Sequence, residues 1–143
     1  MQVFAKSPCR VDLAGGTLDI WPLYLYHANA VTLNFAVSVY TSCRITQRPG
    51  SAITLKSLDQ KIEETYDCLD TLTGAKRHRH PLAAHVLKHF RPGGGLLVET
   101  ASESPQGAGI SGSSSLLIST VSAFNKLCGT RYPIERIREL MGH

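Results

Sequence analysis

The sequence predicts an α+β domain with strands in the first half of the chain and helices in the second. Segments rich in Val, Ile, Thr and Tyr lie within residues 2–58, and apolar residues at helical spacing follow from residue 81. A loop rich in glycine and serine precedes the longest expected helix. Strands followed by helices are typical of α+β folds, and 143 residues fit one domain, residues 1–143.

The expected strands are separated by proline and glycine, which break regular structure. They cover residues 2–6, 10–14, 31–47 and 52–58, with a break at residues 7–8 and a turn at residues 48–51. Alternation of polar and apolar residues supports the second and third of these strands. Because a short turn joins the last two, we expect residues 41–58 to form a β-hairpin.

The expected helices cover residues 81–90, 113–127 and 133–140, and a short strand at residues 96–99 lies between the first two. Pro81 suits the first turn of a helix, where its missing N–H costs nothing. Gly129 suits the end of the second helix, because glycine readily adopts the left-handed conformation there.

Composition narrows the functional classes. Apolar residues make up 43% of the chain and charged residues 18%, which excludes a mainly disordered protein. The net charge of +4 comes with one short basic run, residues 76–80, so we expect no nucleic-acid partner. No apolar stretch is long enough for a membrane span, and four cysteines lack a CxxC spacing. We therefore expect a cytoplasmic protein with reduced thiols.

The segment from residue 105 to residue 115 is the strongest chemical signal. Its small residues let the backbone approach a ligand, and the helix that follows presents free N–H groups and a positive dipole end. Such a helix start binds phosphate well. The candidate nucleotide-binding residues are Pro105, Gly107, Ala108, Gly109, Ile110, Ser111, Gly112, Ser113, Ser114 and Ser115. A flexible loop with a serine cap is the competing interpretation.

Three other phosphate loops do not fit this segment. The spacing Gly107-x-Gly109-x-x-Gly112 matches the dinucleotide fingerprint, but Pro105 and several other residues separate it from the preceding strand. A Walker A loop requires a Gly-Lys-Ser/Thr sequence, and no lysine is present. A protein-kinase glycine loop joins two strands, whereas this loop opens a helix.

A second segment, residues 7–19, combines a strand, a glycine turn and two carboxylates. Its charged residues are Arg10 in the strand and the carboxylates Asp12 and Asp19, and Gly16 and Thr17 lie in the turn. Taken alone, the same residues are more typical of a strand end with surface charges.

Together the two segments resemble the signatures of GHMP kinases, the family of galactokinase, homoserine kinase and mevalonate kinase. The family loop reads roughly Pro-x-x-x-Gly-Leu-Ser/Gly-Ser-Ser-Ala, and residues 105–114 align with it without a gap. Gly112 replaces the first serine of the pair, and Ser113 matches the second, which ligates Mg²⁺ in the family. A register shifted by one residue would give that role to Ser114. The segment at residues 7–19 is similar to the heptose and fucose branches of the family.

The resemblance implies ATP and Mg²⁺ as cofactors, with Ser113 as the metal ligand. It implies that Arg10 is catalytic, near the transferred phosphate, and that Gly16, Thr17 and Asp19 bind the sugar. It also implies the ribosomal protein S5 domain 2-like fold of a GHMP N-terminal domain.

The expected activity is ATP-dependent phosphorylation of a hydroxyl group of a sugar or sugar phosphate. Isoprenoid and amino-acid acceptors are the rivals, but those branches usually carry a lysine motif in place of Arg10. Sugar-kinase members also have a later aspartate and a C-terminal domain. We expect this chain to lack both, so that a missing domain or a second chain completes the site. The alternative is a catalytically incomplete nucleotide- or RNA-binding module with an S5-like fold.

Overall fold

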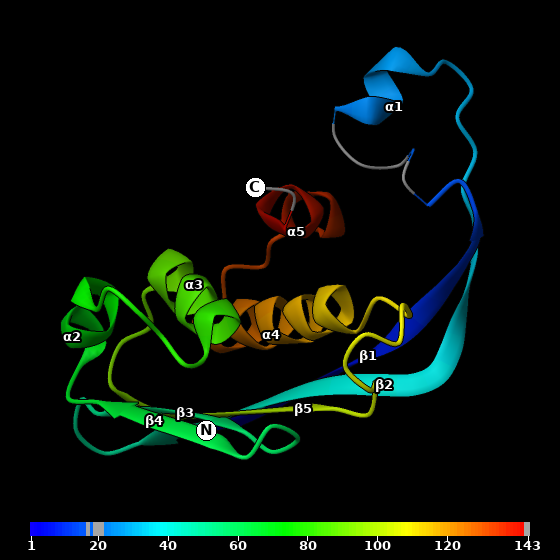
Figure 1. Ribbon diagram of the computed structural model, residues 1–143. Helices are drawn as coiled ribbons and strands as arrows, with labels where there is room; N and C mark the ends of the chain where they lie inside the picture. The colour runs from blue at the N-terminus through cyan, green and yellow to red at the C-terminus, as the bar shows by residue number, and fades with distance from the viewer. Residues whose placement is uncertain (17, 19–21, 142–143) are drawn as a thin grey trace.

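The computed structural model describes residues 1–16, 18 and 22–141 of the chain (Figure 1). Five strands form one sheet, and they are β1 (Gln2–Ala14), β2 (Leu33–Arg48), β3 (Ile53–Ser57), β4 (Ile62–Tyr66) and β5 (Gly95–Ser102). The helices are α1 (Leu23–Tyr26), α2 (Leu69–Gly74), α3 (Pro81–Phe90), α4 (Gly112–Cys128) and α5 (Ile134–Met141).

The strand order in the sheet is β1-β2-β5-β3-β4. The pair β3–β5 is parallel, and the other neighbouring strands are antiparallel. Helices α2, α3 and α4 cover one face of this sheet, while α5 lies on the side of α4 that faces away from it (Figure 1). The predicted α+β class is therefore confirmed as a two-layer arrangement. Within the described residues, none of the helices has the length and apolar character needed to cross a membrane.

The core lies between the sheet and the helical layer. Alternate residues of the central strands point into it, including the fully buried Ile45, Leu55 and Val98. Leu87 of α3 and Phe124 of α4 fill the space above them and are also fully buried. This burial fixes α4 against β1 and β2, and the N-terminus of α4 follows the candidate phosphate loop.

The expectation of separate strands at residues 2–6 and 10–14 is corrected to one continuous strand, β1. Its pairing with β2 shifts register between Pro8 and Cys9, where two extra residues of β2 form a bulge. Pro8 is tolerated inside β1 because this strand lies at the edge of the sheet, so its missing N–H breaks no ladder. Beyond the bulge, β1 and β2 continue as a curved ribbon that carries α1 (Figure 1).

The predicted hairpin over residues 41–58 is wrong, because β5 lies between β2 and β3. Leu96 and Val98 of β5 are fully buried, which suits a central strand. The unpredicted β4 carries Glu63 and Thr65 exposed and pairs only with β3 at the edge. The short turn between β2 and β3 therefore does not make these two strands neighbours in the sheet.

Candidate functional site

The loop that joins β5 to α4 has a backbone shape that requires small residues. Gly107 and Gly109 have φ angles of 75° and 69°, in the left-handed region that glycine adopts without strain. No heavy atom outside their chain neighbours lies within 4 Å of where a Cβ would stand at either position. Both glycines are exposed, and so are Pro105 and Ala108. The loop therefore presents open backbone to solvent.

Gly112, the departure from the family serine, has a steric explanation. A Cβ at this position would lie 2.8 Å from Oγ of Ser104 and 3.0 Å from its Cβ. The Ser104 side chain thus occupies the space that a side chain at position 112 would need.

The first turn of α4 offers the donors that a phosphate would use. Ser111 precedes the helix with φ 58° and makes no side-chain capping bond, while its carbonyl accepts the N–H of Ser115 at 2.9 Å. The N–H groups of the residues between them have no earlier helical carbonyl to bond. Ser113 and Ser114 are exposed on this turn. The turn therefore combines free N–H groups with two accessible hydroxyl groups.

Ser115 differs from the two serines before it. It is buried, and its hydroxyl lies 3.0 Å from the carbonyl oxygens of both Ser7 and Pro8. The hydroxyl of Thr41, on β2, lies 2.9 Å from the same oxygen. The Ser115 hydroxyl, expected from the sequence to face a phosphate, instead joins α4 to the sheet.

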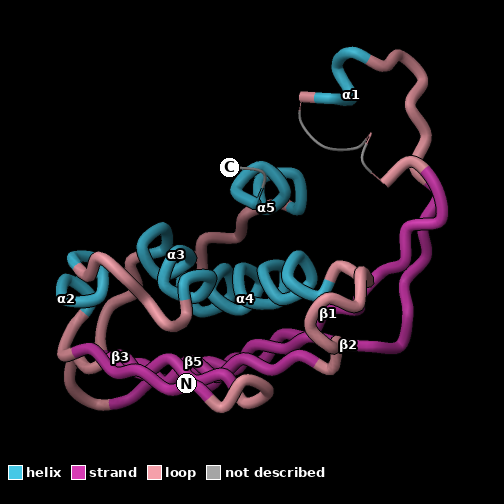
Figure 2. Tube along the Cα trace, in the orientation of Figure 1, coloured by secondary structure: helices cyan, strands magenta, loops and turns pink. Residues whose placement is uncertain are grey.

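Arg10 lies directly beside the loop. Its backbone N–H donates to the carbonyl oxygen of Ile110 at 3.2 Å, so the two sequence motifs meet (Figure 2). Figure 2 shows the loop at the end of the sheet where β1 and β2 leave the helical layer. The Arg10 side chain makes a two-point ion pair with Asp12, with Nε–Oδ1 at 3.0 Å and Nη2–Oδ2 at 3.4 Å.

Asp12 also contacts the glycine turn. A Cβ added at Gly16 would lie 3.0 Å from both Cβ and Oδ2 of Asp12. Asp12 therefore joins Arg10 to the turn expected to bind sugar, and our sequence reasoning gave it no role. The period of two along a strand was the available signal, since Arg10 and Asp12 share one face of β1. Thr17 and Asp19, the other expected sugar contacts, lie outside the described residues.

Glu103 anchors the other end of the loop. Its carboxylate accepts the backbone N–H of Tyr40 at 2.8 Å, and its own N–H donates to the Tyr40 carbonyl at 2.9 Å. The loop is thus attached to β2 at its start and to β1 at its end, with the exposed glycines between these two points.

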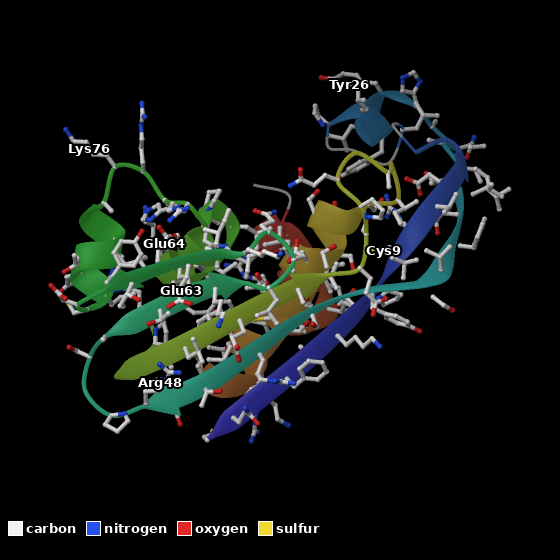
Figure 3. The ribbon with its side chains drawn as sticks, turned by 60° about the horizontal axis from the view of Figure 1, so that its bottom comes forward. Cys9, Tyr26, Arg48, Glu63, Glu64 and Lys76 are labelled. Atoms are coloured by element: carbon white, nitrogen blue, oxygen red, sulfur yellow. The ribbon has the colours of Figure 1, made fainter. Side chains whose placement is uncertain are left out.

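A second polar cluster lies at the opposite edge of the sheet from Arg10. The Tyr66 hydroxyl donates to Glu64 at 2.9 Å and lies 2.8 Å from Nδ1 of His78. Burial raises the pKa of Glu64, but bonds from the backbone N–H groups of Arg79 and His80, and from Tyr66, outweigh it and leave the pKa below its usual value. Figure 3 shows Glu64 far from Cys9, the neighbour of Arg10. The backbone at the end of the basic run, at Arg79 and His80, thus binds a carboxylate.

The fold and the loop together resemble the N-terminal domain of GHMP kinases, and comparison with known proteins supports this resemblance. The sequence model of the GHMP kinases N terminal domain matches residues 76–143. The chain is 31% identical over 152 residues to the L-fucokinase/L-fucose-1-P guanylyltransferase of Bacteroides fragilis. It is 29% identical over 122 residues to the D-glycero-alpha-D-manno-heptose 7-phosphate kinase of Campylobacter jejuni.

Solved structures show the same fold. The D-glycero-D-manno-heptose 1-phosphate kinase from Bacteroides thetaiotaomicron superposes with a TM-score of 0.84 at 21% identity, over 97% of this chain and 46% of that one. The mevalonate kinase of Methanococcus jannaschii gives a TM-score of 0.78 at 16% identity, over 99% of this chain and 45% of that one. The chain has the fold of a GHMP kinase N-terminal domain, and its sequence resembles that family, as the two motifs predicted.

The matched relatives are longer than this chain. It aligns over 89% of its own length with the Bacteroides fragilis protein but spans 16% of that protein. It aligns over 83% of its length with the Campylobacter jejuni kinase and spans 36% of it.

Proposed function

We propose that this chain holds the phosphates of ATP in a kinase that phosphorylates a hydroxyl group of a sugar or sugar phosphate. The observation that carries the proposal is the bond from Arg10 N–H to the Ile110 carbonyl at 3.2 Å, because it places the arginine strand against the phosphate loop. The names of the curated relatives, a fucokinase and a heptose-phosphate kinase, support the class of acceptor.

Each part of the site has a task that its chemistry suits. Free N–H groups at the start of α4 bind phosphate oxygens, and the exposed backbone at Gly107 and Gly109 allows close approach. Arg10 stabilises negative charge on the transferred group, with its guanidinium held by Asp12. Gly16, together with Thr17 and Asp19, contacts the sugar in this proposal.

Magnesium fits the same turn of α4. Mg²⁺ prefers oxygen ligands and is commonly held by one or two protein groups together with substrate phosphates. The exposed hydroxyl of Ser113 would supply one such oxygen, with Ser114 as the alternative. The bound ion would neutralise charge on the phosphate oxygens. Among the residues that the structure describes, no cluster of three or more His, Cys, Asp or Glu side chains forms a separate metal site.

The proposal includes the cellular setting. All four cysteines are free thiols in the structure, at positions 9, 43, 68 and 128. Unpaired thiols are typical of proteins in a reducing compartment, so we propose the cytoplasm.

A thermal melt with and without Mg-ATP tests the nucleotide part. Ligand at 100 times its dissociation constant stabilises a protein by about 2.7 kcal/mol, which is several degrees for a domain of this size. Ser113→Asp is a sharp control because an added carboxylate favours the first turn of a helix but repels a phosphate. We expect this variant to melt at or above the wild-type temperature without ligand and to lose the Mg-ATP shift.

Release of ADP by the complete gene product, measured with a panel of sugars and sugar phosphates, tests the transfer. A melt that responds to Mg-ATP without any acceptor-dependent ADP release would favour the alternative, a nucleotide-binding module. A melt that ignores Mg-ATP in the complete gene product would contradict the proposal.

A further inference from the structure

One buried side chain ties the proposed nucleotide-binding helix to the strand that carries Arg10. The Ser115 side chain lies on the first turns of α4, and its hydroxyl is 3.0 Å from the carbonyl oxygens of Ser7 and Pro8 on β1. Its single proton is donated to these two carbonyls. The contact spans more than a hundred residues of sequence, so it is a tertiary link and not part of the helix itself.

Thr41 completes this link from the neighbouring strand. Its hydroxyl lies 2.9 Å from the Ser115 oxygen, and because the Ser115 proton points to β1, Thr41 is the donor of this pair. Ser115 is 3% exposed and Thr41 1% exposed. Water therefore cannot replace either partner without a rearrangement, and a lost bond leaves a buried polar group unpaired.

The link is placed at the bulge of β1. Pairing with β2 shifts register directly after Pro8, and a bulge turns the strand locally. Arg10 follows two residues later, and its backbone N–H bonds to Ile110 in the loop. The same short stretch of β1 is thus fixed to the loop and helix at two points, Ser115 on one side and Ile110 on the other.

We propose that Ser115 is a positioning residue, whose hydroxyl sets the distance between the helix start that binds phosphate and the guanidinium of Arg10. This inference rests on the proposed function, because it assigns both of those groups to one reaction. Displacement of a catalytic group by about 1 Å can lower a rate about 100-fold. Loss of the Ser115 hydroxyl should therefore reduce turnover far more than a purely structural bond would.

The chain offers a matched control in Ser119, one helical turn further along α4. Ser119 is 1% exposed, bonds to the Leu116 carbonyl at 3.0 Å, and approaches Thr41 at the longer distance of 3.4 Å. It makes no bond to β1 among those the structure describes. Ser119→Ala thus removes a different buried serine hydroxyl from the same helix. The bonds from Ser115 to β1 stay intact.

The experiment measures kcat, KM for ATP and the urea midpoint of the complete gene product as wild type, Ser115→Ala and Ser119→Ala. We expect the urea midpoint to fall more in Ser115→Ala than in Ser119→Ala, because Ser115→Ala leaves buried groups of β1 and β2 without a partner. We expect kcat to fall about 10- to 100-fold in Ser115→Ala and less than about twofold in Ser119→Ala. Thr41→Val, which removes the donor to Ser115 and keeps the side-chain shape, should give an intermediate decrease in kcat.

The possible outcomes distinguish failure of the Ser115 role from failure of the proposed function. Equal kcat in Ser115→Ala and Ser119→Ala, with wild-type activity present, would overturn the role of Ser115 and leave the proposed function standing. Absence of Mg-ATP binding and of ADP release in the wild type would overturn the proposed function and this inference together. If Ser115→Ala does not fold, Thr41→Val decides, and a wild-type kcat in that variant rejects the link.

Discussion

Replacement of Gly112 by alanine tests the steric explanation for the missing family serine. The new Cβ would lie 2.8 Å from Oγ and 3.0 Å from Cβ of Ser104. Rotation of the Ser104 side chain can move its Oγ, but its Cβ is fixed to the backbone. The loop must therefore shift by several tenths of an ångström, which disturbs the candidate phosphate site.

The size of the effect follows from two opposing terms. Overpacking of this kind costs about 1–3 kcal/mol. Alanine is a better helix former than glycine by about 0.5–1 kcal/mol. Gly112→Ala should therefore destabilise the fold by up to about 2.5 kcal/mol when Ser104 is present. With Ser104→Gly, the clash is gone and the same change should stabilise the fold by about 0.5–1 kcal/mol.

Urea unfolding of the four proteins of this double-mutant cycle measures the coupling free energy. The cycle cancels the separate effects of Ser104→Gly on the loop, because they appear on both sides. We expect a coupling of about 1–3 kcal/mol between positions 104 and 112. If Gly112→Ala stabilised the fold equally in both backgrounds, the contact with Ser104 would not explain the glycine.

Asp12→Ala removes a carboxylate that pairs with the Arg10 guanidinium at two points. We expect ADP release by the complete gene product to fall at least about tenfold with an unchanged melting temperature, and an unchanged rate would argue against a positioning role for Asp12. Burial, then the bond to Glu64, raises the pKa of Tyr66 to about 12. Its neutral form stabilises the fold below about pH 10 and loses this effect towards pH 12, so urea midpoints should fall more steeply in wild type than in Tyr66→Phe. Iodoacetamide at neutral pH should label the half-buried Cys68 before the fully buried Cys43. A bond to the nearby threonine hydroxyl lowers the pKa of Cys68, whereas burial raises the pKa of Cys43 to about 12. Equal labelling by mass spectrometry would contradict this.

The elements that the sequence predicted well are those with local causes. The helical spacing of apolar residues over 113–127 reappears as α4, which ends at Cys128 and is capped by Gly129 with φ 63°. Pro81 begins α3, as its position indicated. The two motifs were also sufficient to predict the resemblance to GHMP kinases, because each is an unusual run of consecutive residues.

The features that the sequence did not predict depend on contacts between distant residues. The insertion of β5 between β2 and β3 depends on buried Leu96 and Val98 meeting strands more than forty residues away. The continuity of β1 through Pro8 depends on its place at the edge of the sheet. Local propensity predicts neither the position of β5 in the sheet nor the edge position of β1. The predicted hairpin and the predicted strand break were therefore wrong.

The serines of the loop show why residue type alone does not assign a role. Ser113, Ser114 and Ser115 are consecutive, and the sequence predicts that all three contact the nucleotide, with Ser113 or Ser114 also as the metal ligand. The helix turns about 100° per residue, so the third hydroxyl points towards β1 while the first two remain exposed. One run of identical residues thus supplies two candidate ligand contacts and one tertiary bond. A helix start that binds phosphate is useful for transfer only when a cation is held at a fixed distance from it, and the buried hydroxyl at position 115 is where this chain fixes that distance.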